Sequence, residues 1–162
     1  MINTKPLDIV KRNEIEDLLY EYAQIVDNGD ITKWPDFFTE NGSYYVYARD
    51  NYDRGLPVAF IMDDHKGKIK DRVTLIEKIW TYNFVYQRHQ ISNILVKETN
   101  DQKLSCSANF SIYTTSREGK TDLFAVGRYE DILVFEDNKP KIEQRKVILD
   151  TYTLPSYFVY PL

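Results

Sequence analysis

Cysteine and histidine are scarce in this chain, which has one cysteine and two histidines among its 162 residues. Cys106 alone can form neither an intramolecular disulfide nor a thiolate metal cluster. A Rieske [2Fe–2S] cluster takes two cysteines and two histidines, and a structural zinc site usually takes four such ligands. The composition therefore excludes both kinds of metal centre, and the lone cysteine fits a reducing cytoplasm.

Glycine-rich loops and an excess of basic charge are also missing. The six glycines are scattered, and neither G-x-x-x-x-G-K-[ST] nor G-x-G-x-x-G occurs, so no phosphate-binding loop for a nucleotide cofactor is indicated. The 21 basic and 25 acidic residues give a net charge of −4 and are spread along the chain. Because nucleic-acid binding depends on a basic surface that neutralises phosphates, we expect no nucleic-acid partner.

Long apolar runs are absent as well, since none approaches the roughly 20 residues of a membrane span. The first residues, MINTKPLDIVKRNEIEDLLY, carry a charge every few positions where a signal peptide would have an apolar segment. We therefore expect a cytoplasmic protein that does not contact a membrane. With no internal repeat and no Pro/Gly/Ser-rich linker, residues 1–162 are expected to form a single domain.

An amphipathic helix is the first element that the sequence indicates. Asn28-Gly29 has the chemistry of a left-handed helix C-cap, so the helix should end there. Asp30 or Thr32 can then begin a short second helix, which Pro35 keeps separate from the first. The apolar face of the first helix follows spacings of three and four and consists of Ile15, Leu18, Leu19, Tyr22, Ile25 and Val26.

A second long helix is predicted from about Lys70 to Thr81. Its N-terminal turn would hold Asp71, because the helix dipole favours an acidic residue there, and Arg72 could reach a partner. The apolar positions that indicate this helix are Ile69, Val73, Ile76 and Trp80.

Alternation with a period of two replaces the helical pattern further along the chain. From Leu104 to Thr114 the even positions are apolar, except the last, and the odd ones are mainly polar, as in a half-buried strand. Its neighbours are predicted at Gln90–Glu98, Asp122–Phe135 and Lys141–Tyr152, separated by the turn sequences TNDQ, REGK and EDNKP. Gly127 in mid-strand suggests a bulge or a strong bend. Together these elements predict an α+β fold whose helices pack inside or against a strongly curved antiparallel sheet.

Aromatic residues are abundant, with 13 tyrosines and 14% aromatic residues overall. Tyrosine combines an apolar ring with a polar hydroxyl, so this surplus suits a protein interface or a ligand cavity. The irregular connection between Ala48 and Lys70 is of a length typical of lids, binding surfaces and partner contacts. One end of the fold is expected to be closed by an apolar plug of Trp34, Phe37, Phe38 and the tyrosines of the opening strand, Tyr44, Tyr45 and Tyr47.

His89, Asp27 and Tyr45 form the set that could carry out acid–base chemistry. The aspartate would fix the tautomer of the imidazole, and the tyrosine would polarise a substrate. The alternative is a hydrogen-bonded structural histidine. His65, in the charged sequence DDHKGK, is expected to be solvated or at an interface, and no local spacing favours an iron site built from both histidines and a carboxylate. Cys106 lies on the apolar face of its strand and is expected to be a small buried side chain.

Several stretches occur in an order and spacing that are specific as a set: LDIVKRNEIEDLLYEYAQIVDNGDITKWPDFFTENGSYYV, KDRV, YQRHQISNI, SANFSIYTTSREGKTDLFAVGRYEDILV and IEQRKVILDTYTLPSYFVYPL. On these stretches the chain resembles the small (β) subunits of aromatic-ring-hydroxylating dioxygenases over nearly its whole length. Within that family it is most similar to the subunits of anthranilate, terephthalate and salicylate-type oxygenases.

The resemblance implies a cone-shaped α+β barrel of the nuclear transport factor 2-like kind, the fold of ketosteroid isomerase and scytalone dehydratase. It implies a noncatalytic structural subunit without a cofactor of its own. The Rieske [2Fe–2S] cluster and the mononuclear Fe(II) would belong to a separate large (α) subunit, with three copies of each chain in the complex. A trimer of this chain is implied, and a reductase or ferredoxin would be contacted only indirectly.

The family phrases assign roles to residues of this chain as well. The resemblance implies fold maintenance and subunit contacts, rather than bond making, for Asp71, Arg72, Arg88, His89, Ser92, Asn93, Gly127 and Arg128. Arg128, Glu130 and Asp131 are expected to make cross-strand ion pairs. Two alternatives stay open, namely a stand-alone isomerase or dehydratase that uses His89, Asp27 and Tyr45, and a small-molecule binding module. The enzyme would need an open cavity of a few hundred Å³ where those groups converge.

Overall fold

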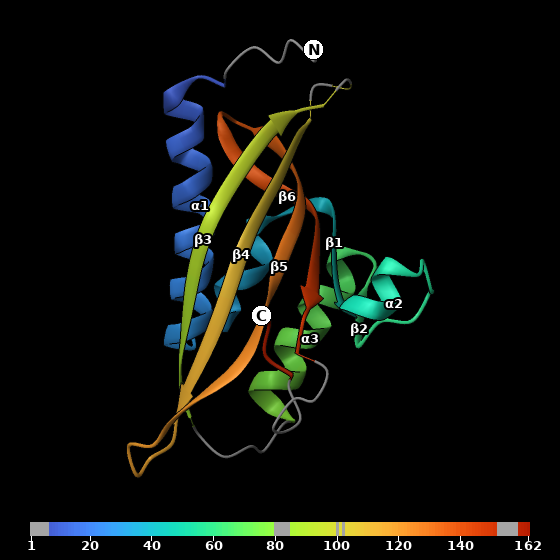
Figure 1. Ribbon diagram of the computed structural model, residues 1–162. Coiled ribbons are helices and arrows are strands. Elements are labelled where there is room, and N and C mark those ends of the chain that lie inside the picture. Colours follow the sequence, from blue (N-terminus) through green and yellow to red (C-terminus); the bar gives the residue numbers. More distant parts are fainter. Residues whose placement is uncertain (1–6, 80–84, 100, 102, 152–158) are drawn as a thin grey trace.

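The computed structural model describes residues 7–79, 85–99, 101, 103–151 and 159–162. Three α-helices, one 3-10 helix (η1) and six strands are formed by these residues (Figure 1). In chain order they are α1 (Ile9–Asn28), η1 (Ile31–Phe37), β1 (Phe38–Ala48), α2 (Arg49–Asp53), β2 (Ile61–Asp63), α3 (Lys66–Lys78), β3 (Tyr86–Glu98), β4 (Leu104–Thr115), β5 (Thr121–Glu136) and β6 (Lys139–Leu149).

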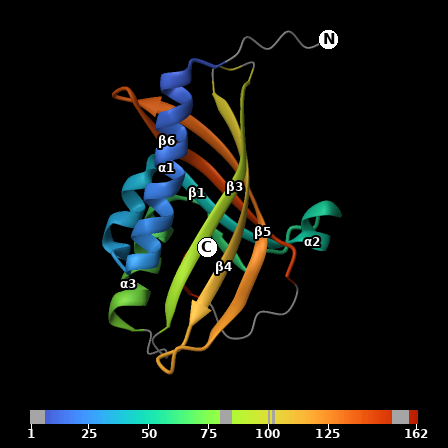
Figure 2. The same ribbon diagram turned by 60° about the vertical axis from the view of Figure 1, so that its left-hand side comes forward.

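The strands form one curved sheet in the order β2-β1-β6-β5-β4-β3. Strands β3 to β6 are joined by successive antiparallel hairpins, as the turn sequences predict. The sheet is antiparallel, as predicted, except that β1 pairs with β6 in parallel. Helices α1 and α3 lie on the same side of this sheet, and α2 lies on the other side (Figure 2). The α+β class with a strongly curved sheet is confirmed.

Helix α1 ends as predicted. Gly29 adopts φ 78°, in the left-handed region, and its N–H bonds to the carbonyl groups of Ile25 and Val26. Asp30 occupies the N-cap position of η1, but its carboxylate bonds to Lys33 at 3.3 Å rather than to the backbone of the helix. The chain therefore breaks between α1 and η1, and the apolar face of α1 packs on the sheet.

Helix α3 begins at Lys66, four residues before the predicted start, and Thr81 lies outside the described residues. The predicted capping role of Asp71 is wrong, because Asp71 is exposed and lies in the second turn. The helix was predicted to start too late because its first residues, Lys66, Gly67 and Lys68, are not apolar and so do not show the helical periodicity.

Position 127 must be a glycine because neighbouring atoms come too close to leave room for a side chain, and the predicted bulge does not occur there. A Cβ atom at this position would collide with the carbonyl oxygen of Ile148 and with the ring of Phe110. The register of β4 with β5 continues through Gly127 and shifts instead between Ile112 and Tyr113. The last residue predicted for the strand at 141–152, Tyr152, lies outside the described residues, and β6 ends at Leu149.

A buried aromatic cluster follows the helix break. The indole of Trp34 has no exposed surface and meets the rings of Phe38 and Tyr44 edge to face, with centroids 5.5 and 5.1 Å apart. The predicted inclusion of Tyr45 and Tyr47 is wrong. These two rings stack on each other at 6.0 Å on the opposite face of β1, because successive side chains of a strand alternate between its faces.

Residue Leu162 is inserted among these aromatic side chains and is only 2% exposed. Its carbonyl oxygen accepts hydrogen bonds from the hydroxyl groups of Tyr22 and Tyr44 at 3.2 and 3.4 Å. Its N–H donates to the hydroxyl of Tyr44 at 2.9 Å. The last residues of the sequence thus complete the hydrophobic core.

Candidate functional site

The last turn of α1 is tied to the beginning of β3 through Asp27 and His89. The carboxylate of Asp27 accepts hydrogen bonds from the backbone N–H of His89 at 2.9 Å and from its ring Nδ1 at 2.6 Å. The His89 side chain has no exposed surface, and that of Asp27 is 8% exposed. Because a carboxylate only accepts, Nδ1 carries the proton, and Nε2 has no hydrogen-bond partner among the described residues.

Tyr45 does not join this pair. It lies opposite Met62 of β2 and Lys146 of β6, on the outer face of the sheet. Among the hollows formed by described residues are two of about 450 and 420 Å³, and His89 lines neither of these two. The structure thus brings together two members of the predicted acid–base set and separates the third, which weakens the stand-alone enzyme alternative.

A second polar group lies deeper in the cone. Arg145 on β6 and Asp131 on β5 are cross-strand partners and form two bonds, of 3.0 and 2.7 Å, with neither side chain exposed. The guanidinium lies between the rings of Tyr22 and Tyr129, 4.1 and 4.3 Å from their centroids. Burial raises the pKa of Asp131, although the nearby guanidinium of Arg145 opposes this shift.

Sequence reasoning expected a cross-strand pair for Asp131 but did not single out Arg145. The alternation of side chains along β5 could have indicated that Asp131 is buried. Asp131 lies at an odd position, on the same face of the strand as Ala125, Tyr129 and Leu133, and all of these are buried. Apolar residues at even positions of the same strand, such as Phe124 and Ile132, obscured this face.

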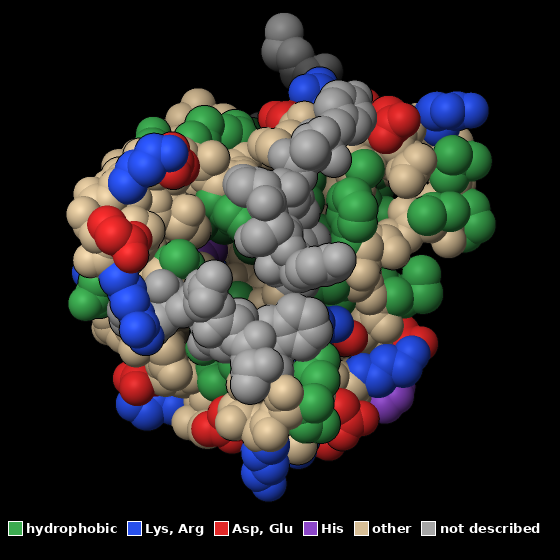
Figure 3. Space-filling view, turned by 90° about the horizontal axis from the view of Figure 1, so that it is seen from below, with side chains coloured by type: hydrophobic (Ala, Val, Ile, Leu, Met, Phe, Trp, Pro, Cys, Tyr) green, Lys and Arg blue, Asp and Glu red, His purple; other side chains and the backbone are tan. Residues whose placement is uncertain are grey.

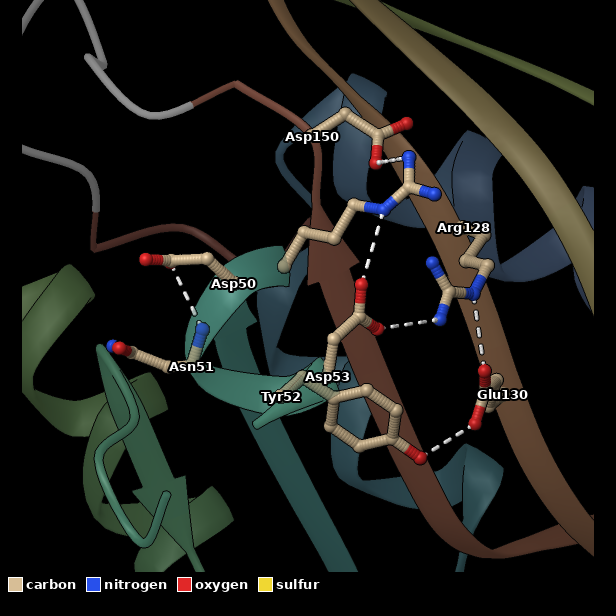
Figure 4. Close-up of polar contacts among 8 residues, drawn as sticks. Asp50, Asn51, Tyr52, Asp53, Arg128, Glu130 and Asp150 are labelled. Carbon is tan, nitrogen blue, oxygen red and sulfur yellow. Dashed lines mark hydrogen bonds and ion pairs between the residues drawn. The ribbon is translucent and has the colours of Figure 1, made fainter. Parts of the chain in front are cut away.

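The outer face of the sheet carries an ionic network with α2, shown in Figure 4. Arg128 bonds to Glu130 at 3.0 Å and approaches Asp53 at 3.8 Å. Tyr52 donates to Glu130 at 2.6 Å, and its pKa is raised to about 12 by burial and by that carboxylate. Arg49 links the network to Asp150 and Asp53, at 3.0 and 3.4 Å.

The prediction of a cross-strand ion pair is therefore wrong for Arg128 and Glu130. They pair along β5 itself, because residues two apart on a strand face the same side. Since the members of this outer network are partly exposed, its ion pairs add little to the stability of the fold.

The connection from α2 to α3 projects from the body of the cone beside α2 (Figure 1). Apolar side chains along it are between 37% and 56% exposed, namely Leu56, Val58, Phe60 and Met62. Arg72 of α3 holds the base of this segment, bonding to both carboxylate oxygens of Asp63 at 2.6 and 3.0 Å. Arg72 also donates to the carbonyl oxygen of Val159 at 3.5 Å.

The remaining residues named from the sequence are dispersed. Arg88 is exposed on β3 and donates to the carbonyl oxygen of Gln87 at 3.2 Å. Asn93 adopts φ 55° at a register shift of β3, which is a conformation that asparagine tolerates better than most residues. His65 is 61% exposed at the side chain, as expected. Cys106 is buried, and burial raises the pKa of its thiol to about 12, so it is no nucleophile at neutral pH.

No group of three or more His, Cys, Asp or Glu side chains that could hold a metal ion is found in the described part of the chain. None of the helices in that part combines the length and the apolar character that crossing a membrane requires.

Comparison with known proteins gives one consistent result. The family model described as "Ring hydroxylating beta subunit" matches residues 21–156. The chain is 26% identical to the anthranilate 1,2-dioxygenase small subunit of Burkholderia cepacia, over 92% of each chain. It is 27% identical to subunit beta 2 of the terephthalate 1,2-dioxygenase terminal oxygenase component of Comamonas sp., over 93% of this chain and 99% of the relative.

A solved structure agrees with these relatives. The β subunit assigned to an aromatic-ring-hydroxylating dioxygenase of Novosphingobium aromaticivorans superposes with a TM-score of 0.83 at 26% identity. The match covers 93% of this chain and 95% of that one.

Proposed function

The chain belongs to the ring-hydroxylating β-subunit family, and from this membership we propose that it is a noncatalytic structural subunit of a Rieske non-haem iron dioxygenase. It supports the dihydroxylation of an aromatic compound by a large α subunit, which carries the Rieske [2Fe–2S] cluster and the mononuclear Fe(II). The observation that carries this proposal is the family match over residues 21–156, which spans α1 to β6 apart from the first turns of α1.

The interior of the cone supports a structural role. Its centre is filled by the ion pair of Arg145 with Asp131, by the rings of Tyr22 and Tyr129, and by the cluster around Trp34. Each of these side chains has at most 2% of its surface exposed. Interior space that an enzyme of this fold would use for substrate is here occupied by the protein's own side chains.

The exterior supports a role in assembly. Phe60 and Met62, which are exposed between α2 and α3, and the tyrosines and arginines of the outer network belong to residue types that are enriched in protein interfaces. In the proposed complex three copies of this chain form a trimer that carries three α subunits in the cytoplasm, and a reductase or ferredoxin acts on the α subunit. Asp71, Arg72, Arg88, Asn93 and Arg128 serve its fold or its subunit contacts.

The named substrates of the two curated relatives are benzene rings that bear a carboxylate. An aromatic acid is therefore the substrate class that we infer for the complete oxygenase. This chain would influence that substrate only through the α subunit it supports.

Co-expression with a Rieske-type α subunit tests the proposal. A tag is placed at the N-terminus, because Leu162 is buried. The expected result is co-purification of both chains in equal amounts, with iron present in the complex and absent from the tagged chain purified alone. A monomer that converts a small ketone or alcohol unaided, and that loses this activity in His89→Gln, would overturn the proposal.

A further inference from the structure

The segment that follows α2 leaves apolar side chains exposed. Residues 55–62, the arm, read GLPVAFIM and contain no charged residue. The arm projects from the body of the cone beside α2 (Figure 1), and in Figure 3 hydrophobic side chains gather along the same right-hand edge of the molecule. Between 37% and 56% of each large side chain is exposed, namely of Leu56, Val58, Phe60 and Met62. Exposed apolar side chains gathered in one place are characteristic of protein contact sites.

The outer side of the sheet is uncovered beyond the strands against which α2 packs. Of the described α-helices only α2 lies on this side, and it packs against β1 and β6 (Figure 2). Odd-numbered side chains of β4 point outward there, because the even-numbered ones from Leu104 to Ile112 are buried. Together with outward side chains of the neighbouring strands they form the bare face, which includes Gln90, Leu95, Ser107, Asn109, Tyr113 and Leu123.

The bare face carries little charge. β4 contains no charged residue, although 28% of the chain is charged. Of the outward side chains of β3 and β4, only Arg88 and Lys97 are charged, and they lie near the two ends of β3. Depletion of charge at the centre with a polar rim is the pattern of a protein interface.

The arm and the bare face match in charge and in size. Since neither has a charge at its centre, bringing them together strips water from no ion, which is the costly step in burying polar surface. The outer side of β3 and β4 with the start of β5 is about 40 Å long and presents roughly 500 Å² in projection, comparable with the roughly 800 Å² that each partner buries in a standard interface. An extended segment of the arm's length spans at most about 29 Å, so it fits within this face.

The two surfaces lie at different places on one chain. The arm leads into β2 at one edge of the sheet, and β6 and β5 separate this edge from the bare face. A contact between two different patches of identical chains is heterologous, and it closes into a ring when the rotation between copies allows. We propose that the arm of one copy packs on the bare face of the next copy, and that three such contacts close the trimer. This inference rests on the proposed function, which supplies the trimer, and deepens it by naming the two surfaces in contact.

Cysteine cross-linking tests this contact, because Cys106 is only 1% exposed and offers no accessible thiol of its own. The tagged chain is co-expressed with a Rieske-type α subunit, and thiols are joined by a short bismaleimide. Val58→Cys and Asn109→Cys place one thiol on the arm and one on the bare face, both at exposed positions. The double variant should give covalent dimers and trimers of this chain on a denaturing gel. Each single variant should stay a monomer, because a heterologous contact keeps equivalent residues apart.

The matched control is Val58→Cys with Tyr20→Cys, which places the second thiol on α1 at a position that is 42% exposed and should give no covalent trimer. Covalent dimers from a single variant would mean an isologous contact, and a cross-link to the α subunit would mean that this subunit covers the arm. Either result, or no cross-link in a complex that contains both subunits, overturns the proposal and leaves the proposed function intact. If the α subunit does not co-purify, the proposed function fails, and cross-linking of this chain alone decides the contact.

A charge placed on the arm gives a second measurement. Val58→Asp should leave the fold intact, because the side chain is 56% exposed. It should weaken the association of copies about tenfold or more, because the new carboxylate loses its water in the contact. Val10→Asp, on α1 at a position that is 59% exposed, is the control and should associate as the parent chain does. Sedimentation velocity of the co-expressed complexes over a range of concentrations compares the two, and equal association of both variants would also overturn the proposal.

Discussion

Arg145 and Asp131 form a bidentate ion pair inside the cone, with both side chains completely buried between neighbouring strands. Removing two charges from water is expensive, and their attraction compensates for it only when the geometry is good and the remaining polar atoms are satisfied. Nη1 of Arg145 has no hydrogen-bond partner among the described residues. The pair is therefore strongly coupled but contributes little net stability compared with an apolar replacement.

Removing one partner of this pair should destabilise the fold much more than replacing both partners by apolar side chains. Arg145→Met leaves the Asp131 carboxylate buried without its counter-charge, and we expect a loss of about 3–5 kcal/mol in the free energy of unfolding. The double variant Arg145→Met with Asp131→Leu should recover most of that loss, because no charge then stays buried. Urea denaturation of the two variants and the parent chain measures both values. A double variant no more stable than the single one would contradict this account of the pair.

Trp34 should be a large contributor to stability. Trp34→Ala removes a fully buried indole from its contacts with Phe38 and Tyr44, and the expected loss is about 3–5 kcal/mol, as for other large-to-small core substitutions. The control is Tyr20→Ala, at a position of α1 that is 42% exposed, for which a change within about 0.5 kcal/mol is expected. Denaturation midpoints compare the two, and an unchanged midpoint for Trp34→Ala would show that the aromatic cluster is not part of the cooperative core.

The sequence predicted those parts of the fold that rest on local periodicity. The apolar face of α1, the cap at Gly29 and the alternation of β4 all follow from side chains close together in the chain. The parallel pairing of β1 with β6 did not follow, because it joins residues about a hundred positions apart and leaves no local pattern.

The candidate site was also predicted only in part. His89 and Asp27 were named because their chemistry is distinctive, and the structure places Nδ1 of His89 2.6 Å from Oδ1 of Asp27. Tyr45 was assigned to the wrong side because two neighbouring tyrosines, Tyr44 and Tyr45, are equally compatible with facing inward. Strand register decided between them, and register depends on the pairing of β1 with β2 and β6.

Stability should decline at alkaline pH because three phenols, those of Tyr22, Tyr44 and Tyr129, are buried and have raised pKa values. The pKa shift is larger for the last two than for Tyr22. Burial raises the pKa of Tyr44 and of Tyr129 well above the ordinary value of 10.0. Above that pH the unfolded chain releases these protons while the folded chain keeps them. The contribution of these protonated phenols to the free energy of unfolding is therefore complete below about pH 10. It is lost as the pH rises further, by up to about 1.4 kcal/mol per pH unit for each tyrosine.

Tyr44→Phe separates this titration from packing. The variant should lose about 1–3 kcal/mol near neutral pH, because the N–H of Leu162 is left without its acceptor, and its stability should fall less steeply above pH 10. Tyr20→Phe, on the exposed part of α1, is the matched control and should keep the parent profile. Urea denaturation at a series of pH values gives the change of stability with pH for each variant and for the parent chain. Parallel curves for Tyr44→Phe and the parent chain above pH 10 would contradict the assignment.

Arg88 should contribute to assembly rather than to the fold. Its side chain is exposed and bonds to the carbonyl oxygen of the adjacent Gln87, a contact too local to stabilise the tertiary structure. Arg88→Glu should therefore change the free energy of unfolding by no more than about 0.5 kcal/mol. Under the proposed function, the same reversal of charge should weaken assembly about tenfold, because charges at an interface act on its specificity and association rate.

The matched control for Arg88 is Arg12→Glu, which reverses a charge on α1 where the side chain is 57% exposed. Both variants are co-expressed with the α subunit, and the recovered complex is measured by analytical ultracentrifugation over a range of concentrations. A reduced yield of complex for Arg88→Glu alone, with both chains folded, would place a subunit contact on β3. Equal assembly of the two variants would mean that the exposed face of β3 stays in solvent, and the contacts would then have to be sought around α2 and the apolar segment that follows it.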